Sequence, residues 1–407
     1  MVKVNGLNVH FIDSEDELNK WMEKILASPP KLIGADIEAN SMYRFHHTIC
    51  LLQLGLPNDI LLVDMQKLRF IDSLAKVLRS PHIIKVFQDM KYDISMFWFE
   101  YQCKVEPVFD IAIADRLIRH ENEYRSQDKL VKEYLDITQQ FSKSVQKSDW
   151  GIRPLSQKQI EYAASDVAYL QPLYQEMKHQ LDELDLTEYI STYMANIESI
   201  QIRRKFNPNS MWKFKGIDRL SKIQLHRLYN LTILRTEIAE VVDRPLHWVI
   251  DNRSMVDLMY AKIHKKSDIL DFFEKRNRTA NLISDFLDQI YSVLTEPIEQ
   301  VIPHNRPPIG ETLKVWLPIE DEHQSIMANI PRAKAIKAWS RLIADEYGIL
   351  PEMIIQKEEL NFCSTLDLTE LERELSMPGI PVSKRNEFVL NLINYLETSD
   401  FSELQAQ

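Results

Sequence analysis

Four carboxylates in apolar segments constrain this 407-residue chain more than any other feature. They are Asp36 and Glu38 in LIGADIEA, Asp93 in IKVFQDMKYDISMF, and Asp166 in IEYAASDVAYL. A bare carboxylate in apolar surroundings is costly unless it is paired or bound to a metal. A fold that brings these four acids together therefore needs a cation to offset the cost of burying their charges.

The stretch around Asp166 predicts a helix that presents a second polar group beside the acid. Ser156 is a suitable N-cap, and a run of good helix formers follows it. Tyr162 and Asp166 are four residues apart, so they lie on one helix face, and the small residues Ala163 and Ala164 allow a close approach. Such a pair alone is more often structural, with the tyrosine capping a buried aspartate; the upstream acids favour a functional role.

Asp36 and Glu38 lie on a predicted strand, where side chains at i and i+2 share a face and Ile37 turns into the core. Such a pair, with one acid from each of two further elements, is typical of sites that hold two hard divalent cations. Two cations about 3.5–4 Å apart can stabilise the attacking and leaving oxygens of phosphoryl displacement. The Tyr162 phenol is well placed to orient the attacking water.

Composition narrows the remaining possibilities. The hydrophobic content of 45% suffices for two or three cored domains, and the eight glycines form no phosphate-binding loop motif. Cys50, Cys103 and Cys363 are odd in number and far apart, which favours a reducing compartment and disfavours a zinc cluster. No secretion signal or membrane-span pattern is present, so we expect a cytoplasmic protein without a membrane partner.

The first 200 residues alternate strands and helices, which predicts an α/β domain with three early strands in an antiparallel meander. The expected strands are Leu7–Phe11, Lys31–Ala39, His47–Leu54, Ile60–Val63 and Ile83–Phe87, and the expected helices are 14–27, 70–79, 91–102, 127–135 and 156–179, with a short segment at 108–118.

Helix dominates after residue 182, with no convincing strand. RRKFNPNSMW reads as part of a basic linker over 201–216, because it combines charge, Asn and Pro. Two helical modules follow, at 217–297 and 331–407, joined by a connecting segment at 298–330. Met255 and Leu360 occupy matching points of a faint internal repeat.

The acidic motifs resemble those of the DEDD exonuclease superfamily, in its tyrosine-bearing branch. The resemblance rests on DIE on a strand, Asp93 on a helix and YxxxD on a later helix. Within that branch, SDWGIRPLSQKQIEYAASDVAYLQPLY is very similar to the ribonuclease D family. The two helical modules resemble the HRDC-type domains of RecQ-type helicases and ribonuclease D.

This resemblance implies a ribonuclease H-like mixed sheet flanked by helices, followed by two small all-α domains. It implies a 3′→5′ exoribonuclease that releases 5′-mononucleotides, in 3′ maturation of tRNA and other small stable RNAs. It makes Asp36, Glu38, Asp93 and Asp166 the ligands of two divalent cations, Mg²⁺ or Mn²⁺, and Tyr162 the residue that positions the water. The expected partner is RNA with a free single-stranded 3′ end, such as a tRNA precursor, and the expected state is a monomer.

Two departures from the family pattern affect the site. Ala39 replaces a residue that is usually aromatic, and Tyr43 is the candidate to take over its contact with a base. Asp89 lies four residues before Asp93 on the same helix face and competes with it as a ligand. We choose Asp93 because its apolar frame matches the family spacing.

Charge is unevenly distributed over a chain whose net charge is −11. The stretch 201–280 has 17 Lys and Arg against 9 Asp and Glu, whereas 351–407 has 4 against 11. Solvated helix faces of random sign explain this equally well. If the charge is functional, the first module extends an RNA track and the second packs against another domain or closes a ring at the substrate entrance. The candidate phosphate contacts are Lys143, Lys147 and Arg153 near the SDW motif, and Lys262, Lys265 and Lys266 in the first module.

Two alternatives stay open. The chemistry also suits a DNA exonuclease, although the helical modules favour RNA. A non-catalytic RNA-binding adaptor is the other, and the intact set of acids argues against it.

Overall fold

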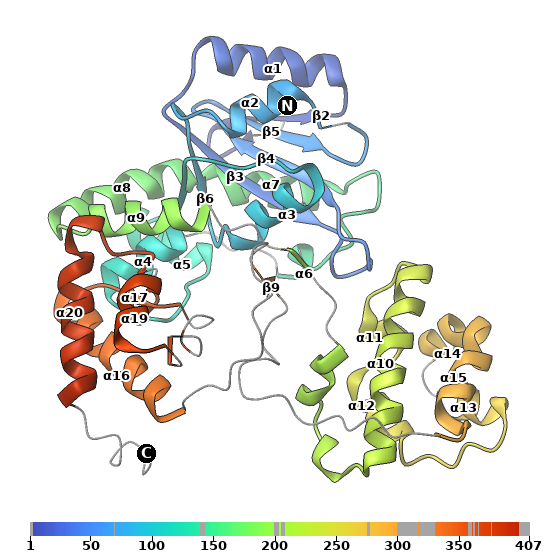
Figure 1. Ribbon diagram of the computed structural model, residues 1–407. Helices are drawn as coiled ribbons and strands as arrows, with labels where there is room; N and C mark the ends of the chain where they lie inside the picture. The colour runs from blue at the N-terminus through green and yellow to red at the C-terminus, as the bar shows by residue number, and fades with distance from the viewer. Residues whose placement is uncertain are drawn as a thin grey trace. The chain divides into compact units, whose positions relative to one another are not determined.

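The computed structural model describes residues 3–68, 70–138, 143–198, 203–204, 208–274, 277–298, 316–317, 330–356, 360, 363–364, 366–375 and 377–398. Its contacts divide the chain into two compact units (Figure 1). The first contains residues 1–39, 48–203 and 318–407, and the second contains 40–47 and 204–317. Most of the predicted connecting segment 298–330 lies outside the described residues.

A seven-stranded mixed sheet forms the centre of the first unit. Its order is β1 (Lys3–Val4), β2 (Leu7–Ile12), β5 (Asp59–Asp64), β4 (Ile49–Gly55), β3 (Leu32–Ala39), β6 (Ile84–Phe87) and β7 (Val108–Asp110). Strands β3, β4 and β5 pair in the antiparallel manner, whereas β6 joins β3 and β7 in parallel. The predicted meander and the predicted α/β class are confirmed.

Helices follow the strands as the sequence pattern predicts. They are α1 (Glu15–Ala27), α2 (Asp72–Leu78), α3 (Lys91–Tyr101), α4 (Ile111–Arg119), α5 (Gln127–Leu135), α6 (Lys143–Gln146), α7 (Gln157–Ala168), α8 (Leu170–Glu183) and α9 (Thr187–Glu198). The single helix predicted over 156–179 is wrong, because the structure divides it at Tyr169 into α7 and α8. Pro172 is the cause: a proline in a continuous helix would clash with the carbonyl of Ala168, whereas the first turn of a new helix tolerates it.

Helix α7 lies directly on the sheet at two glycines. A Cβ at Gly34 would lie 3.0 Å from the carbonyl oxygen of Val167, and a Cβ at Gly55 would lie 2.7 Å from the same atom. Gly34 and Gly55 are opposite each other on β3 and β4. The missing side chains therefore set how closely the helix that carries Asp166 approaches the strand that carries Asp36.

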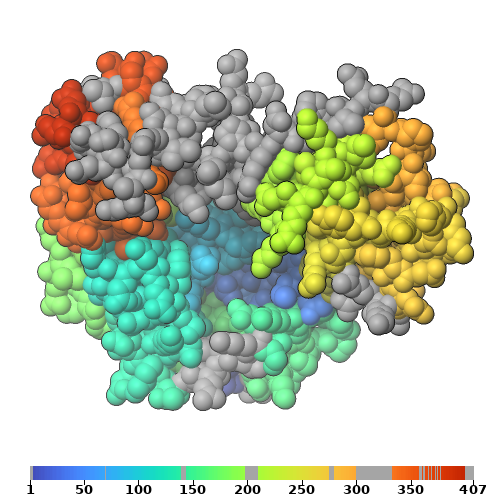
Figure 2. Space-filling view, turned by 90° about the horizontal axis from the view of Figure 1, so that it is seen from below, coloured from blue at the N-terminus to red at the C-terminus, as the bar shows by residue number. Residues whose placement is uncertain are grey.

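The second helical module packs within the first unit. It comprises α16 (Ile330–Tyr347), α17 (Pro351–Ile354), α19 (Leu368–Glu374) and α20 (Val382–Thr398), and its buried Trp339 and Phe388 belong to the same core cluster as the sheet. Figure 2 shows its orange and red atoms against the green and teal atoms of the α/β domain. This packing agrees with the prediction that the acidic module contacts another domain.

A buried ion pair joins this module to α4. Arg116 is 2% exposed, and its two terminal nitrogens donate to the two carboxylate oxygens of Glu352 at 2.6 and 2.9 Å. The ring of Tyr124 covers the guanidinium, with the guanidinium carbon 4.3 Å from the ring centroid. Bidentate geometry and burial make this contact strong, and they make the loss of one partner costly.

We expect Glu352→Ala to lower the free energy of unfolding by about 2–4 kcal/mol, because it leaves a buried guanidinium without its counter-charge. Chemical denaturation measures this change. Asp345→Ala is the control: it removes the partner of His120 from a pair in which Asp345 is 75% exposed, and should cost less than about 1 kcal/mol. Equal losses in the two variants would show that the Arg116 pair contributes no more than a surface contact.

The second unit is helical with its own core. Its elements are the 3₁₀ turns η1 (Pro208–Lys213), η2 (Ile217–Arg219) and η3 (Ser284–Phe286), and helices α10 (Lys222–Val242), α11 (Leu246–Val249), α12 (Asn252–Leu258), α13 (Lys266–Phe272), α14 (Asn277–Ile283) and α15 (Leu287–Thr295). Met211, Trp212 and Phe214 are buried in this core. Part of the segment predicted as a linker over 201–216 thus packs in the helical module.

Two further observations differ from the sequence-based predictions. Strands β8 (Arg203–Arg204) and β9 (Trp316–Leu317) pair with each other, where no strand was expected. The loop Asn40–His47, which connects β3 to β4, belongs to this unit. Asp243, the C-cap of α10, accepts hydrogen bonds from the backbone N–H groups of Phe45 and His46, both at 3.0 Å.

Among the described helices, none is long and apolar enough to span a membrane.

Candidate active site

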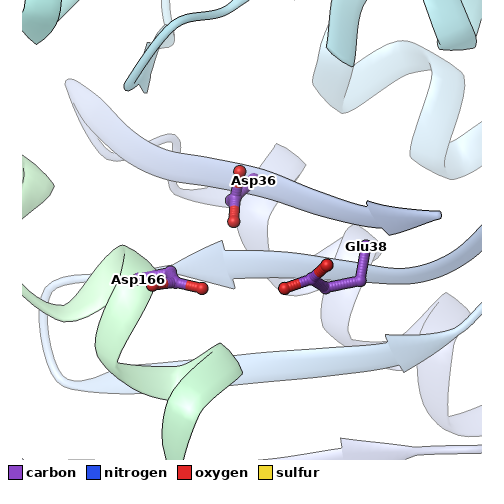
Figure 3. A group of neighbouring side chains, drawn as sticks. All are labelled: Asp36, Glu38 and Asp166. Atoms are coloured by element: carbon purple, nitrogen blue, oxygen red, sulfur yellow. The ribbon is translucent and has the colours of Figure 1, made fainter. Parts of the chain in front are cut away.

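Strand β3 and helix α7 bring three of the predicted acids together. Asp36 and Glu38 project from the same face of β3, and Asp166 projects from α7, which lies on that face. One carboxylate oxygen from each lies within 4.8 Å of the others. Figure 3 shows the three carboxylates pointing toward a common space between the strand and the helix.

The fourth acid, Asp93, reaches the same cluster from the first turn of α3. Its side chain is 6% exposed and hydrogen-bonds to Asp36. Its Oδ2 atom is buried and has no hydrogen-bond partner in the described part of the chain. The start of α3 is held by Asp110, whose carboxylate accepts from the backbone N–H groups of Asp89 and Met90 at 3.0 and 2.9 Å. The expectation that Asp89 lies on the same helix face as Asp93 is wrong, because Asp89 precedes α3 with φ 60°. The choice of Asp93 as the ligand stays a prediction.

Burial and mutual repulsion make the cluster unfavourable as free carboxylates. Burial raises the pKa of Asp36 to about 7. Burial, and then the charges of Asp36 and Asp166, raise the pKa of Glu38 well above its usual range. Burial also raises the pKa values of Asp93 and Asp166, and the charge of Asp36 adds to both shifts. A carboxyl group of Asp93 that retains its proton donates a hydrogen bond to Asp36, which lowers the repulsion between the two.

These shifts predict how the stability of the metal-free protein depends on pH. The folded protein keeps protons that the unfolded chain loses, so the free energy of unfolding should fall as pH rises from about 4 through 7. Denaturation across this range should show the decline in wild type, and Asp36→Asn should flatten it by about 1–3 kcal/mol. Identical pH profiles of the two proteins would show that ionisation of Asp36 does not cause the loss of stability as pH rises.

Tyr162 lies on the α7 face beside Asp166. Its hydroxyl donates a hydrogen bond to the Asp166 carboxylate, and its ring packs against Trp150 with centroids 6.1 Å apart. Burial, followed by the charges of Asp166 and Glu38, raises the pKa of Tyr162 above its usual range. The phenol therefore stays protonated and acts as a hydrogen-bond donor, not as a base.

The residues of this cluster fit divalent cations. Every candidate ligand is a carboxylate, the donor type that hard cations prefer. A cation site without its cation should have buried carboxylate oxygens that lack partners and carboxyl groups with raised pKa values. The unpartnered Oδ2 of Asp93 and the raised pKa values of Glu38 and Asp93 agree with this. Asp36, Glu38, Asp93 and Asp166 could hold such ions.

Arg153 has a structural role in place of the predicted phosphate contact. Its Nε and one terminal nitrogen donate to the buried carboxylate of Asp64 at 2.8 and 2.7 Å. The remaining donors bind backbone carbonyls of Cys50, Trp150 and Ile152. All five guanidinium donors are engaged, so the arginine anchors the SDW segment to the end of β5.

The other predicted binding residues are placed as follows. Lys147 is exposed just after α6, and Lys143 begins α6, with its side chain outside the described part. Tyr43 lies in the second unit, edge-on to Trp248 at 5.8 Å between ring centroids. Lys262, Lys265 and Lys266 are exposed in that unit, and Lys266 pairs with Asp288 at 2.6 Å.

Comparison with known proteins identifies the α/β domain. Residues 9–182 match the family described as 3′-5′ exonuclease. These residues are a 3′–5′ exonuclease domain. The match includes Asp36, Glu38, Asp93, Tyr162 and Asp166, so the acidic centre described above lies wholly inside the exonuclease domain.

Longer similarities extend beyond the exonuclease domain. The chain is 27% identical to ribonuclease D of Pseudomonas paraeruginosa over 334 residues, 81% of this chain and 82% of that protein. A solved protein from Bifidobacterium adolescentis has a TM-score of 0.73 at 18% identity, with 96% of this chain and 97% of that chain covered. Ribonuclease D of Escherichia coli, described as an exoribonuclease involved in structured RNA processing, has a TM-score of 0.61 at 18% identity and covers 96% of this chain and 99% of its own. The resemblance to ribonuclease D is confirmed.

Proposed function

We propose that this protein is a divalent-cation-dependent exoribonuclease that removes 5′-mononucleotides from the 3′ end of RNA. The observation that carries this proposal is the convergence of four acids from β3, α3 and α7, with a phenol hydrogen-bonded to the last of them. The match of residues 9–182 to the family described as 3′-5′ exonuclease supports the direction of cleavage.

We assign the cation ligands to Asp36, Glu38, Asp93 and Asp166. Two divalent cations, Mg²⁺ or Mn²⁺, would supply charge stabilisation for the attacking and leaving oxygens of phosphodiester hydrolysis. Tyr162 then orients the attacking water through a lone pair of its hydroxyl oxygen, because its single O–H donates to Asp166 beside the cluster. Its second contact, with Trp150, limits the motion of the ring.

RNA is the favoured substrate. Support comes from the names of the relatives, since ribonuclease D proteins match most of the chain. From the sequence resemblance to ribonuclease D we also propose that the natural substrates include tRNA precursors and other small stable RNAs and that the helical modules are of the HRDC type. We further propose that the protein works in the cytoplasm as a monomer. The three buried free thiols suit a reducing compartment.

The substrate proposal is tested with single-stranded RNA and DNA of the same sequence, labelled at the 5′ end and incubated with Mg²⁺ or Mn²⁺. We expect RNA to shorten stepwise from the 3′ end and EDTA to stop the reaction. Preferential shortening of DNA would favour a DNA exonuclease, and binding without shortening would favour a non-catalytic adaptor.

The basic cluster of the first helical module gives a separate prediction. Replacing Lys262, Lys265 and Lys266 by Ala should weaken binding of long RNA and flatten its salt dependence by about two units of slope, because each lost phosphate contact removes about 0.7. Cleavage of a dinucleotide should barely change. The matched control replaces three exposed lysines outside the basic stretch, Lys20, Lys31 and Lys76. An equal slope change in both variants would show that net charge, not this cluster, determines binding.

A further inference from the structure

Gln53 is a buried amide that the chemistry described above does not use. It lies in the middle of β4, where every residue is buried, and its side chain is fully shielded from solvent. Neither Nε2 nor Oε1 has a hydrogen-bond partner among the described residues. Buried polar side chains are rarely left unpaired, so this amide needs an explanation.

The register of the sheet places this amide beside Asp36. Gln53 and Asp36 are direct partners in the antiparallel pairing of β4 with β3. Directly opposite residues project from the same face, with Cβ atoms about 4.5–5.5 Å apart. Two positions along each strand, Gly34 and Gly55 form the next pair on that face, and both lie beneath Val167 of α7. Gln53 therefore lies under α7, at the inner side of the acidic cluster.

Burial separates the possible roles of this residue. Asp36 and Asp166 are partly exposed, as groups that meet a substrate must be, whereas Gln53 has no exposed surface. Contact with RNA is thus excluded without a rearrangement of β4. The neighbour that an amide at this position can serve is the carboxylate across the strand pair.

We propose that Gln53 is a positioning residue for Asp36: when a cation is bound, the Nε2 that is unpaired in the metal-free protein donates to the Asp36 carboxylate and holds it in the orientation that binds the cation. A carboxylate that binds a cation through one oxygen is commonly fixed by a donor on its other side. The amide supplies that donor without adding charge to a crowded acidic centre. This inference rests on the proposed cation site.

The test measures cation affinity without turnover. Mn²⁺ is titrated into metal-free wild type, Gln53→Met and Gln53→Asn by calorimetry, and the thermal unfolding midpoint of each metal-free protein is recorded. Methionine keeps the length and volume of glutamine but removes the donor, so Mn²⁺ affinity should fall about tenfold or more. The midpoint should stay equal or rise, because an unpaired buried amide has been replaced by an apolar group. Gln53→Asn withdraws the donor and should also weaken binding.

Leu54→Met is the matched control, since Leu54 is equally buried and its side chain lies on the opposite face of β4. Its Mn²⁺ affinity should equal that of wild type. Unchanged affinity in Gln53→Met, or a loss matched by lower stability, would overturn the role of Gln53. If Gln53→Met does not fold, unchanged affinity in Gln53→Asn overturns it as well. Failure of wild type itself to bind Mn²⁺ would overturn the cation site on which the inference rests.

Discussion

Asp36→Asn should reduce turnover about 10³-fold or more and make the metal-free protein more stable at the same time. Asp36 contacts both the hydrogen-bonded Asp93 and the cluster with Glu38 and Asp166, so it contributes to every part of the proposed cation site. Loss of a ligand removes several kcal/mol of charge stabilisation in the transition state, and each 1.36 kcal/mol is tenfold in rate. The amide also removes one charge from a group of like charges, so unfolding above pH 7 should require about 1–3 kcal/mol more.

Steady-state cleavage of labelled RNA and denaturation at pH 8 measure the two effects, and Mn²⁺ calorimetry shows whether cation binding is lost with turnover. Asp89→Asn is the control, because Asp89 precedes α3 in a left-handed backbone conformation (φ 60°) and lies outside the three-acid group. It should keep turnover within a few-fold of wild type. Loss of activity in Asp89→Asn with retention in Asp93→Asn would show that the α3 ligand has been assigned to the wrong residue.

Tyr162→Phe should lower turnover about 100-fold while RNA binding stays nearly unchanged. The ring and its contact with Trp150 are kept, so the change removes only the hydroxyl that donates to Asp166. That hydroxyl also orients a ligand, so turnover must be measured at saturating Mn²⁺ to separate weaker cation binding from slower chemistry.

Tyr169→Phe provides the comparison, since it removes another phenol at the end of the same helix. It should retain wild-type turnover, and RNA affinity measured in EDTA should be the same in all three proteins. Wild-type turnover in Tyr162→Phe at saturating cation would remove the phenol from the mechanism.

The acidic site could be predicted from the sequence because its signals are local. Asp36 and Glu38 share a face by the period of a strand, and Tyr162 and Asp166 share one by the period of a helix. The apolar frame around Asp93 identified the third element. Burying each acid alone would be costly, and a common cation site removes that cost. This cost is the reason to expect that the segments meet at one site.

Long-range pairing explains most of what the sequence did not show. Arg153 looked free near the SDW motif, but its partner Asp64 is 89 residues away in the sequence. Glu352 is 236 residues from Arg116, so the docking of the second helical module had no local signal. Gln53 is a lone amide in the apolar run ICLLQLG, which the sequence shows. Its position beside Asp36 follows only from the strand register.

Backbone details were missed for a different reason. Pro172 indicates the break between the two helices at Tyr169. A proline disrupts the preceding helical turn even where the surrounding residues favour a helix. The paired strands β8 and β9 have two residues each, too few for a periodic pattern.

The most direct test of the central claim is anomalous X-ray diffraction from crystals of the wild-type protein soaked in Mn²⁺. We predict two anomalous peaks about 3.5–4 Å apart, both within coordination distance of the carboxylates of Asp36, Glu38, Asp93 and Asp166. A single peak would contradict the two-cation arrangement. The absence of any peak among these four carboxylates, at a Mn²⁺ concentration that supports RNA cleavage, would contradict the account as a whole.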